Sequence, residues 1–190
     1  NLIVLNRKCR VCESFKLKKV VNFGNVPLGN NLQKSKLEAI KAKTYRLDLL
    51  NCSICNHIQL SNKVDKKILY KSNYTYLSST GKDFLIHLKK YTDNISKIIK
   101  LKKNSLIIDI GSNDGSCLNY FKMKGYKVLG VDPAKIPSQI ANKNGIETLE
   151  SFFNYKISKK IVNKYGYADF ITSHNVLAHV ENLEEIFKNI

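Results

Sequence analysis

The stretch Ser105–Gly115, which reads SLIIDIGSNDG, decides the fold. Its apolar run, Leu106–Ile110, predicts a buried parallel strand, because such strands are covered on both faces. A turn with Gly111 and Gly115 follows, and then a helical stretch. A strand that enters a helix through a tight glycine turn presents free backbone N–H groups and the positive end of a helix dipole to a ligand. The stretch therefore predicts the first unit of a Rossmann-like α/β domain.

A second strand favours ligand binding over an ordinary β-α turn. Residues 126–131, YKVLGV, end in Asp132, which lies 17 residues past Gly115. Rossmann-type units place a ribose-binding carboxylate at about this position. Asp132 is therefore a candidate for binding a nucleoside.

The turn contains acids that a dinucleotide-binding turn lacks. Asp109 precedes the first glycine, and Asp114 lies inside the turn. Carboxylates repel phosphate and attract cations, so a ligand with an ammonium and a sulfonium group suits this turn better than NAD. The stretch resembles motif I of the class I S-adenosylmethionine (SAM) methyltransferases. A nucleotide-binding fold or a degenerate fold is the alternative.

Composition and charge limit the possible functions. The 190 residues have a formal net charge of +17 and are 43% hydrophobic, which suits one or two domains. The lysines are scattered along the chain, so we expect an anionic small substrate rather than nucleic acid. No apolar run reaches the roughly 18 residues that cross a membrane, and no signal peptide is recognisable, so we expect a cytoplasmic protein. The absence of an initial Met leads us to expect a fragment.

Two C-x-x-C pairs indicate a metal site. Cys9 and Cys12 form the first pair, Cys52 and Cys55 the second, and 39 residues separate the pairs. Each pair directs two sulfurs to one point, and two pairs complete a tetrahedral thiolate site. Because four protein ligands leave no open position, we predict a structural Zn²⁺. His57 is left out, since the thiolate set is complete.

The sequence around the cysteines predicts a zinc ribbon. Residues 23–32, FGNVPLGNNL, predict a loop, because Gly, Pro and Asn favour special backbone angles. Residues 45–50 predict a strand that leads to the second pair, and residues 57–60 predict its returning partner. The fifth cysteine, Cys117, is predicted to be a buried apolar residue.

A tyrosine-rich segment, residues 69–80, follows the cysteines. It is either a packed connection between domains or a lid over the cofactor turn that supplies phenol and hydroxyl groups to substrate. Apolar residues then recur at helical spacing from Phe84 to Ile98, which predicts an amphipathic helix to about Leu101. Thr80 and Asp83 have the form of a capping box at its start.

The later sequence predicts the rest of the sheet. We expect a helix over residues 133–144, a third strand at 146–149 and a fourth at 167–173. Residues 174–180, HNVLAHV, would then lie at the carboxyl edge of the sheet, where open α/β folds bind ligands. A last helix begins at Asn182. A complete fold of this type needs roughly three more strands.

The order of these parts resembles the C-methyltransferases of nucleotide-linked keto-deoxysugars. Those enzymes are similar to this chain in having a four-cysteine zinc domain, a tyrosine-rich connection, a SAM-binding Rossmann domain and a C-terminal domain. The resemblance is carried by the cysteine pairs and by residues 23–30, 74–79, 109–115 and 175–180. Asn56 departs from the glycine usual after the last cysteine and leaves the zinc ligands intact. The family's further catalytic Tyr, Glu and His lie beyond Ile190.

The resemblance implies a fold class, domains and cofactors. We expect an α/β class I methyltransferase Rossmann-like domain, C-terminally incomplete, preceded by a small zinc-binding domain. The expected boundaries are 1–65 for the zinc-binding domain, 66–104 for the connection and long helix, and 105–190 for the SAM-binding part. The implied cofactors are SAM and structural Zn²⁺, and the implied substrate is a nucleotide-linked sugar. No nucleic-acid or membrane partner is expected, and a monomer is compatible with the sequence.

The predicted site residues follow from the same motifs. The zinc ligands are Cys9, Cys12, Cys52 and Cys55, and the cofactor-binding residues are Asp109, Gly111, Ser112, Asp114, Gly115, Asp132, Phe152 and Asn175. Phe152 would stack on adenine or pack in the core. The implied chemistry is deprotonation next to a ketone and attack of the enolate carbon on the SAM methyl group.

The candidate for holding or protonating the ketone oxygen is His179. Tyr76 is the second catalytic candidate, and Tyr74 is a weaker one. His174 and His87 are interpreted as structural or surface residues.

Two other functions stay open at this point. A zinc-containing RNA methyltransferase would share the cysteines, the basic charge and SAM, but it is expected to show a concentrated Lys/Arg stripe. The other alternative is an inactive SAM-binding or zinc-dependent scaffold.

Overall fold

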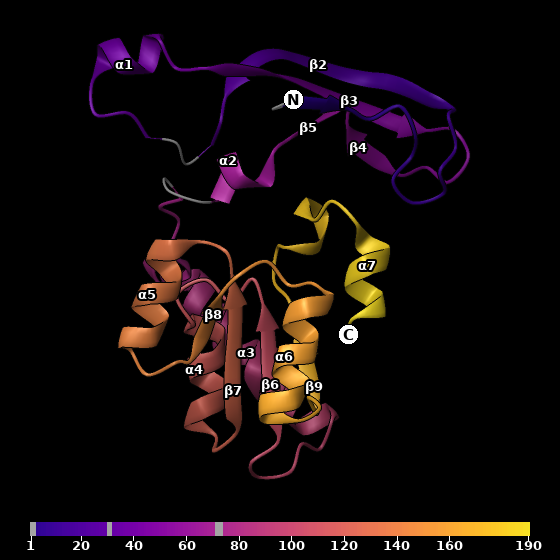
Figure 1. The fold of residues 1–190 in the computed structure, drawn as a ribbon. Coiled ribbons are helices and arrows are strands. Elements are labelled where there is room, and N and C mark those ends of the chain that lie inside the picture. The colour runs from indigo at the N-terminus through magenta and orange to yellow at the C-terminus, as the bar shows by residue number, and fades with distance from the viewer. Residues whose placement is uncertain (1–2, 30–31, 71–73) are drawn as a thin grey trace. The chain divides into compact units, whose positions relative to one another are not determined.

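The computed structural model of the chain describes residues 3–29, 32–70 and 74–190. They form two compact units, Asn1–Tyr74 and Thr75–Ile190 (Figure 1). The division falls within the tyrosine-rich segment, and the long helix after it belongs to the second unit. Among the described residues, no helix is both long and apolar enough to span a bilayer.

The first unit is built from short antiparallel sheets. Its elements are β1 (Ile3–Leu5), β2 (Leu17–Pro27), α1 (Lys36–Ile40), β3 (Thr44–Cys52), β4 (Ile58–Leu60), β5 (Asn62–Val64) and α2 (Lys66–Tyr70). One sheet has the order β2-β3-β4, and β1 pairs with β5. The strand expected to lead into the second cysteine pair is β3, and its returning partner is β4.

The loop predicted at residues 23–32 is wrong in part. Phe23–Pro27 belongs to β2, which pairs with β3 as far as Pro27. The strand accommodates Gly24 at a register shift between Asn22 and Asn25, where Gly24 has a φ of 76°. The glycine and the proline therefore mark an irregularity and the end of a strand, as they can in edge strands. Asn30 and Asn31 lie outside the described residues.

The second unit contains a four-stranded parallel sheet of order β8-β7-β6-β9. Its strands are β6 (Leu106–Ile110), β7 (Lys127–Asp132), β8 (Thr148–Glu150) and β9 (Phe170–Thr172). The first strand lies inside the sheet, with β7 on one side and β9 on the other. This reversal of strand order is the position at which doubly wound folds bind ligands. The expected Rossmann-like arrangement is therefore confirmed for this unit.

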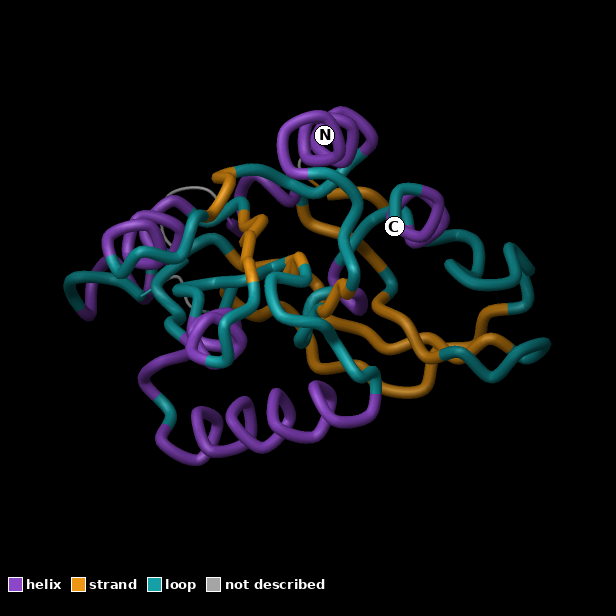
Figure 2. The backbone as a smooth tube through the Cα atoms, turned by 90° about the horizontal axis from the view of Figure 1, so that it is seen from below, coloured by secondary structure: helices purple, strands orange, loops and turns teal. Residues whose placement is uncertain are grey.

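Helices cover both faces of the parallel sheet, as Figures 1 and 2 show. The helical elements are η1 (Ser78–Thr80), α3 (Lys82–Ile98), α4 (Ser116–Met123), α5 (Lys135–Lys143), α6 (Tyr155–Tyr165), η2 (Leu177–His179) and α7 (Leu183–Lys188). On one face, Leu88 of α3 and Phe121 of α4 pack around Ile107. On the other face, Ile161 of α6 packs with Ile108. The sheet is thus buried between two apolar layers, and its carboxyl edge is left for the turns.

Two details differ from the local sequence pattern. Thr80 does not cap α3, because it ends η1 and its hydroxyl donates to the Leu77 carbonyl at 2.7 Å, while Gly81 precedes the helix. Helix α6 is one that the pattern did not single out. It begins at Tyr155 and is capped by Asn154, whose side-chain oxygen accepts a hydrogen bond from the Ile157 N–H at 3.1 Å.

Candidate functional site

Four cysteine sulfurs come together in the first unit. The Sγ atoms of Cys9, Cys12, Cys52 and Cys55 all lie within 4.8 Å of one another. Two of the separations, Cys9 to Cys55 and Cys12 to Cys52, are 3.5 Å. Zn–S bonds of about 2.3 Å in a tetrahedron require sulfurs about 3.8 Å apart. The cluster therefore has close to the size that a Zn²⁺ ion needs, and the four predicted ligands are those brought together.

Backbone hydrogen bonds lower the pKa of the first cysteine of each pair, Cys9 and Cys52, whereas burial and the neighbouring sulfurs raise the pKa of Cys12 and Cys55. Hydrogen bonds from the backbone N–H groups of Cys55 and Ile54 lower the pKa of Cys52 to about 6. The Val11 N–H donates to the Cys9 Sγ at 3.5 Å. Because the thiolate is the metal ligand, these backbone contacts prepare Cys9 and Cys52 to bind zinc.

We predict that replacing one ligand removes the metal. Cys52→Ser should lower the zinc content from about one equivalent to near zero, because structural zinc needs four ligands. Cys117→Ala is the matched control, since Cys117 is a buried cysteine in the other unit. Zinc measured by mass spectrometry of the purified protein checks both variants. Full zinc content in Cys52→Ser would contradict the assignment.

In the second unit, Asp109 and Asp132 lie at the carboxyl ends of neighbouring strands. Asp109 is the register partner of Gly130, and Asp132 follows Gly130 by two residues, so both acids are on one face of the sheet. Burial, together with the charge of Asp132, raises the pKa of Asp109 well above its usual value. Asp109 is 2% exposed, and among the described residues its Oδ1 has no hydrogen-bond partner. An unpaired buried carboxylate oxygen is costly until a donor or a cation approaches it.

Asp132 already accepts two backbone hydrogen bonds. Its Oδ2 accepts from the Asn113 N–H and its Oδ1 from the Ala134 N–H, each at 2.8 Å. A carboxylate has about four lone-pair sites, so Asp132 keeps the capacity to accept from ribose hydroxyls. The backbone contacts fix its position next to the turn.

The glycines of the turn allow close packing. Gly111 has a φ of 77°, and a Cβ added there would lie 2.2 Å from Cγ2 of Val176, in the segment after β9. A Cβ on Gly130 would lie 2.4 Å from the Ser112 Oγ, which is itself buried and without a partner among the described residues. Motif I and the segment after β9 therefore meet directly. The free turn amides expected from the sequence are not found at most positions, because the N–H groups of the turn donate to Val131, Ser112, Asp114 and Asp132. The Asp109 carboxylate and the unpaired Ser112 hydroxyl are the groups that fit a ligand with an ammonium group and a nucleoside.

The tyrosine-rich segment also contacts this turn. The Asn113 Nδ2 donates to the Tyr76 carbonyl at 3.0 Å, and the Ser79 N–H donates to the Asp114 Oδ2 at 2.9 Å. The Asp114 Oδ1 accepts from the Ser116 hydroxyl at 2.6 Å, so both carboxylate oxygens of Asp114 are bound by protein groups. Asn113 was not among the predicted residues, although an Asn inside a glycine turn is the available signal, since Asn tolerates a positive φ.

The other candidates lie around the same edge of the sheet. Asn175 is exposed with a φ of 56°, and His179 is exposed at the end of η2. Phe152 is half-buried after β8, whereas Phe153 belongs to the core. The roles of Asn175, His179 and Phe152 stay predictions.

His174 lies in a buried polar cluster beneath the sheet edge. Its Nε2 is 3.2 Å from the Thr172 Oγ1 and 3.6 Å from the Cys117 Sγ. The Tyr91 hydroxyl is 2.8 Å from the same Thr172 oxygen. Burial lowers the pKa of His174 and raises that of Cys117, which keeps both neutral. These contacts support the interpretation of His174 as a structural residue.

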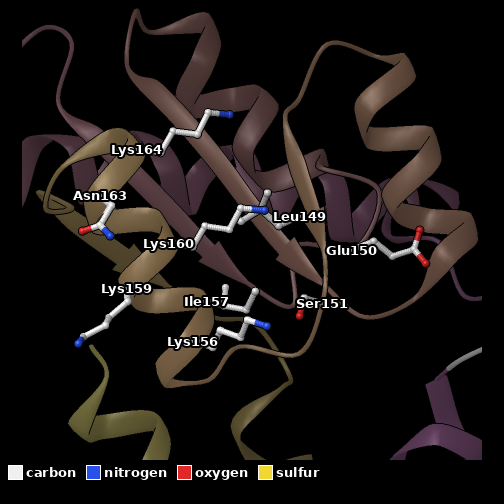
Figure 3. A pocket seen from close by; sticks show the side chains of 9 residues that line it. All are labelled: Leu149, Glu150, Ser151, Lys156, Ile157, Lys159, Lys160, Asn163 and Lys164. Atoms are coloured by element: carbon white, nitrogen blue, oxygen red, sulfur yellow. The ribbon is translucent and has the colours of Figure 1, made fainter.

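An open groove of about 950 Å³ runs along β8 and α6 (Figure 3). Its lining includes the predominantly lysine face of α6, formed by Lys156, Lys159, Lys160 and Lys164. Lys164 pairs with Glu147 at 3.1 Å, and the Lys159 Nζ lies 4.8 Å from the centre of the Tyr155 ring. The groove contains none of the predicted site residues, so the chemistry is assigned to the glycine turn.

Comparison with known proteins supports the two-part interpretation. Residues 84–190 match the family model described as "Methyltransferase domain", and residues 9–70 match the one described as "Putative zinc binding domain". The predicted combination of these two domains is thereby confirmed. The chain is 29% identical over 183 residues to the "C-methyltransferase NovU" of Streptomyces niveus, covering 96% of this chain and 43% of that protein. The chain therefore spans less than half the length of this curated relative.

Solved structures show weaker likeness. The plantazolicin methyltransferase BpumL in complex with SAH is 23% identical, with a TM-score of 0.42, covering 56% of this chain and 40% of that chain. TehB from Haemophilus influenzae is 15% identical, with a TM-score of 0.40, covering 92% and 60%. The fold assignment rests on the family model and the sheet order.

Proposed function

Because the chain belongs to the methyltransferase-domain family over residues 84–190, we propose that it is part of a SAM-dependent C-methyltransferase that acts on a nucleotide-linked keto-deoxysugar. The observation that carries the proposal is the buried pair Asp109 and Asp132 beneath the glycine turn. The similarity to a C-methyltransferase over 96% of the chain supports carbon as the methylated atom. The motifs at residues 74–79 and 175–180 support the sugar substrate.

Different cofactor-binding residues would contact different parts of the SAM molecule. Asp109 supplies negative charge for the ammonium and sulfonium end, and Asp132 accepts from the ribose hydroxyls. The buried Ser112 hydroxyl, which has no partner among the described residues, is a further polar group for the ligand. Bound SAM supplies an electrophilic methyl group.

Methyl transfer to carbon also requires that the protein convert a substrate carbon into a nucleophile. A C–H bond next to a ketone becomes acidic when the developing oxyanion is stabilised. His179 would hold or protonate the ketone oxygen, with Tyr76 as a second donor at the substrate. With SAM bound, the enolate carbon would accept the methyl group as the S–C bond breaks, and S-adenosylhomocysteine would be the leaving group. The exposed positions of His179 and Tyr76 leave both side chains accessible to substrate.

We predict that SAM affinity rises with pH until the raised pKa of Asp109 is passed, by up to about tenfold per pH unit below that pKa. Burial raises that pKa, so at low pH the group is neutral and must lose a proton before it attracts the cation. Asp109→Asn keeps the shape but not the charge. It should bind SAM about tenfold or more weakly at pH 7.5 and show a flatter pH dependence. Calorimetric titration measures both quantities.

The pH dependence of SAM affinity also contains the titration of SAM itself. Comparing the wild-type protein with Asp109→Asn removes that contribution, because both proteins bind the same ligand. Buffers of different ionisation enthalpy should report proton release from the wild-type protein at pH 6. Equal affinities and equal pH dependence in the two proteins would exclude Asp109 from cofactor binding.

We predict that the intact protein exchanges a substrate proton without SAM. Incubated in deuterated water with a nucleotide-linked keto-deoxysugar, it should replace a ring proton next to the ketone, which NMR detects. His179→Gln should slow this exchange roughly 100-fold, because general acid–base groups contribute about 10²–10⁴. His87→Gln, at an exposed histidine of α3, is the control and should exchange normally. No exchange by the wild-type protein with any keto sugar would count against the substrate class.

The lysine face of α6 favours RNA methylation as a second candidate. Lys156 and Lys160 are exposed on the same helical face, four residues apart. Binding through that face should weaken steeply with salt, since each phosphate contact releases a counterion. A gel shift with RNA at low and high salt checks this. Lys156→Gln with Lys160→Gln should weaken the shift if the face binds RNA, and unshifted RNA at low salt would exclude this function.

A further inference from the structure

One segment lies directly on the cofactor turn. We name residues Tyr76–Ser79 the strap. The Ser78 N–H donates to the Asn113 Oδ1 at 2.9 Å, and the Asn113 Nδ2 donates to the Tyr76 carbonyl at 3.0 Å. A single amide side chain therefore pairs with a donor and an acceptor of the strap backbone, two residues apart. Both polar atoms of the Asn113 side chain are used in this contact.

The next residue of the turn holds the strap as well. The Ser79 N–H donates to the Asp114 Oδ2 at 2.9 Å. The other carboxylate oxygen accepts from the Ser116 hydroxyl at 2.6 Å, which fixes Asp114 at the start of α4. Asn113 and Asp114 are 7% and 5% exposed. The strap is thus tied by hydrogen bonds to two buried residues inside motif I.

Asn113 also reaches the predicted ribose-binding acid. Its backbone N–H donates to the Asp132 Oδ2 at 2.8 Å. Its φ is 51°, in the left-handed region that Asn and Gly adopt with least strain. This conformation allows one residue to direct its N–H to Asp132 and its side chain to the strap.

We propose that Asn113 is a positioning residue that sets the strap, and Tyr76 with it, against the cofactor turn, so that cofactor binding and strap docking are coupled. This inference rests on the proposed function for the role of Tyr76. The contacts that hold the strap belong to the turn that the cofactor occupies, so a ligand that fixes the turn also fixes the strap. By linkage, a docked strap strengthens cofactor binding by the same factor.

Hydrogen exchange tests the positioning without any assay of activity. In Asn113→Gly, which keeps the backbone freedom at this φ, the Ser78 amide should exchange roughly 3- to 10-fold faster, because one hydrogen bond is lost. S-adenosylhomocysteine, used as the probe, should slow exchange of the Ser78 and Ser79 amides in the wild-type protein and much less in the variant. Asn104→Gly makes the same substitution at an exposed Asn with a φ of 66° and should leave both amides unchanged.

A double-mutant cycle tests whether Asn113 acts through Tyr76. With keto sugar and SAM, Asn113→Gly should lower kcat about 10-fold or more, because small displacements of a reacting group are costly. On a Tyr76→Phe background the same substitution should cost less than about 3-fold, since the group it positions is already gone. A purely structural role would give equal losses on both backgrounds.

The outcomes separate this inference from the proposed function. Unchanged Ser78 exchange in Asn113→Gly, or wild-type amides that S-adenosylhomocysteine does not protect although it binds, would overturn the positioning role. Failure of the wild-type protein to bind S-adenosylhomocysteine or SAM would instead overturn the proposed function, and the exchange difference between the variants would still report on the strap.

Discussion

Two carboxylates on neighbouring parallel strands, buried beneath one turn, are the constraint on which the second unit depends. Parallel pairing of β6 with β7 places Asp109 and Asp132 on the same face of the sheet. Like charges at a buried site raise each other's pKa and oppose folding unless they are compensated. The backbone amides of Asn113 and Ala134 compensate Asp132, whereas Asp109 keeps an oxygen without a partner in the described residues. Because only Asp132 is compensated by backbone amides, Asp109 is the acid suited to bind a cation.

The sequence predicted the features that strong local constraints determine. The apolar strand before Gly111 and the acid at the end of the next strand belong to one well-defined β-α-β pattern. The spacing of the cysteines likewise favours one geometry, in which all four thiolates bind the same metal. Features that depend on distant partners were not predictable in the same way. Helix α6 is an exception, because Ile157, Ile161 and Tyr165 recur at helical spacing among its lysines and pack against the sheet, so its signal was present in the sequence. The strand conformation of Phe23–Pro27 depends on pairing with β3, which overrides its turn-forming residues.

The two units gain stability from different sources. In the second unit, Phe121 and Leu118 are fully buried between helices and sheet. In the first unit, large apolar side chains such as Phe15 and Leu32 are 70% and 82% exposed. A segment with so small a core needs another source of free energy, and a structural zinc ion supplies on the order of 10 kcal/mol to small domains. Cys9 and Cys52 are buried, so two of the predicted metal ligands form part of that core.

The composition of the turn reflects two demands that conflict. Close packing of the turn against the fold favours glycine, and motif I has glycine at Gly111 and Gly115, where a Cβ would meet the side chain of Val176 or Ile146. Holding the strap requires side chains, and the turn places Asn113 and Asp114 between those glycines. Asn serves both demands, because it tolerates a φ of 51° and still offers a donor and an acceptor. A turn with glycine at that position would keep the backbone conformation, but it could not hold the strap that carries Tyr76.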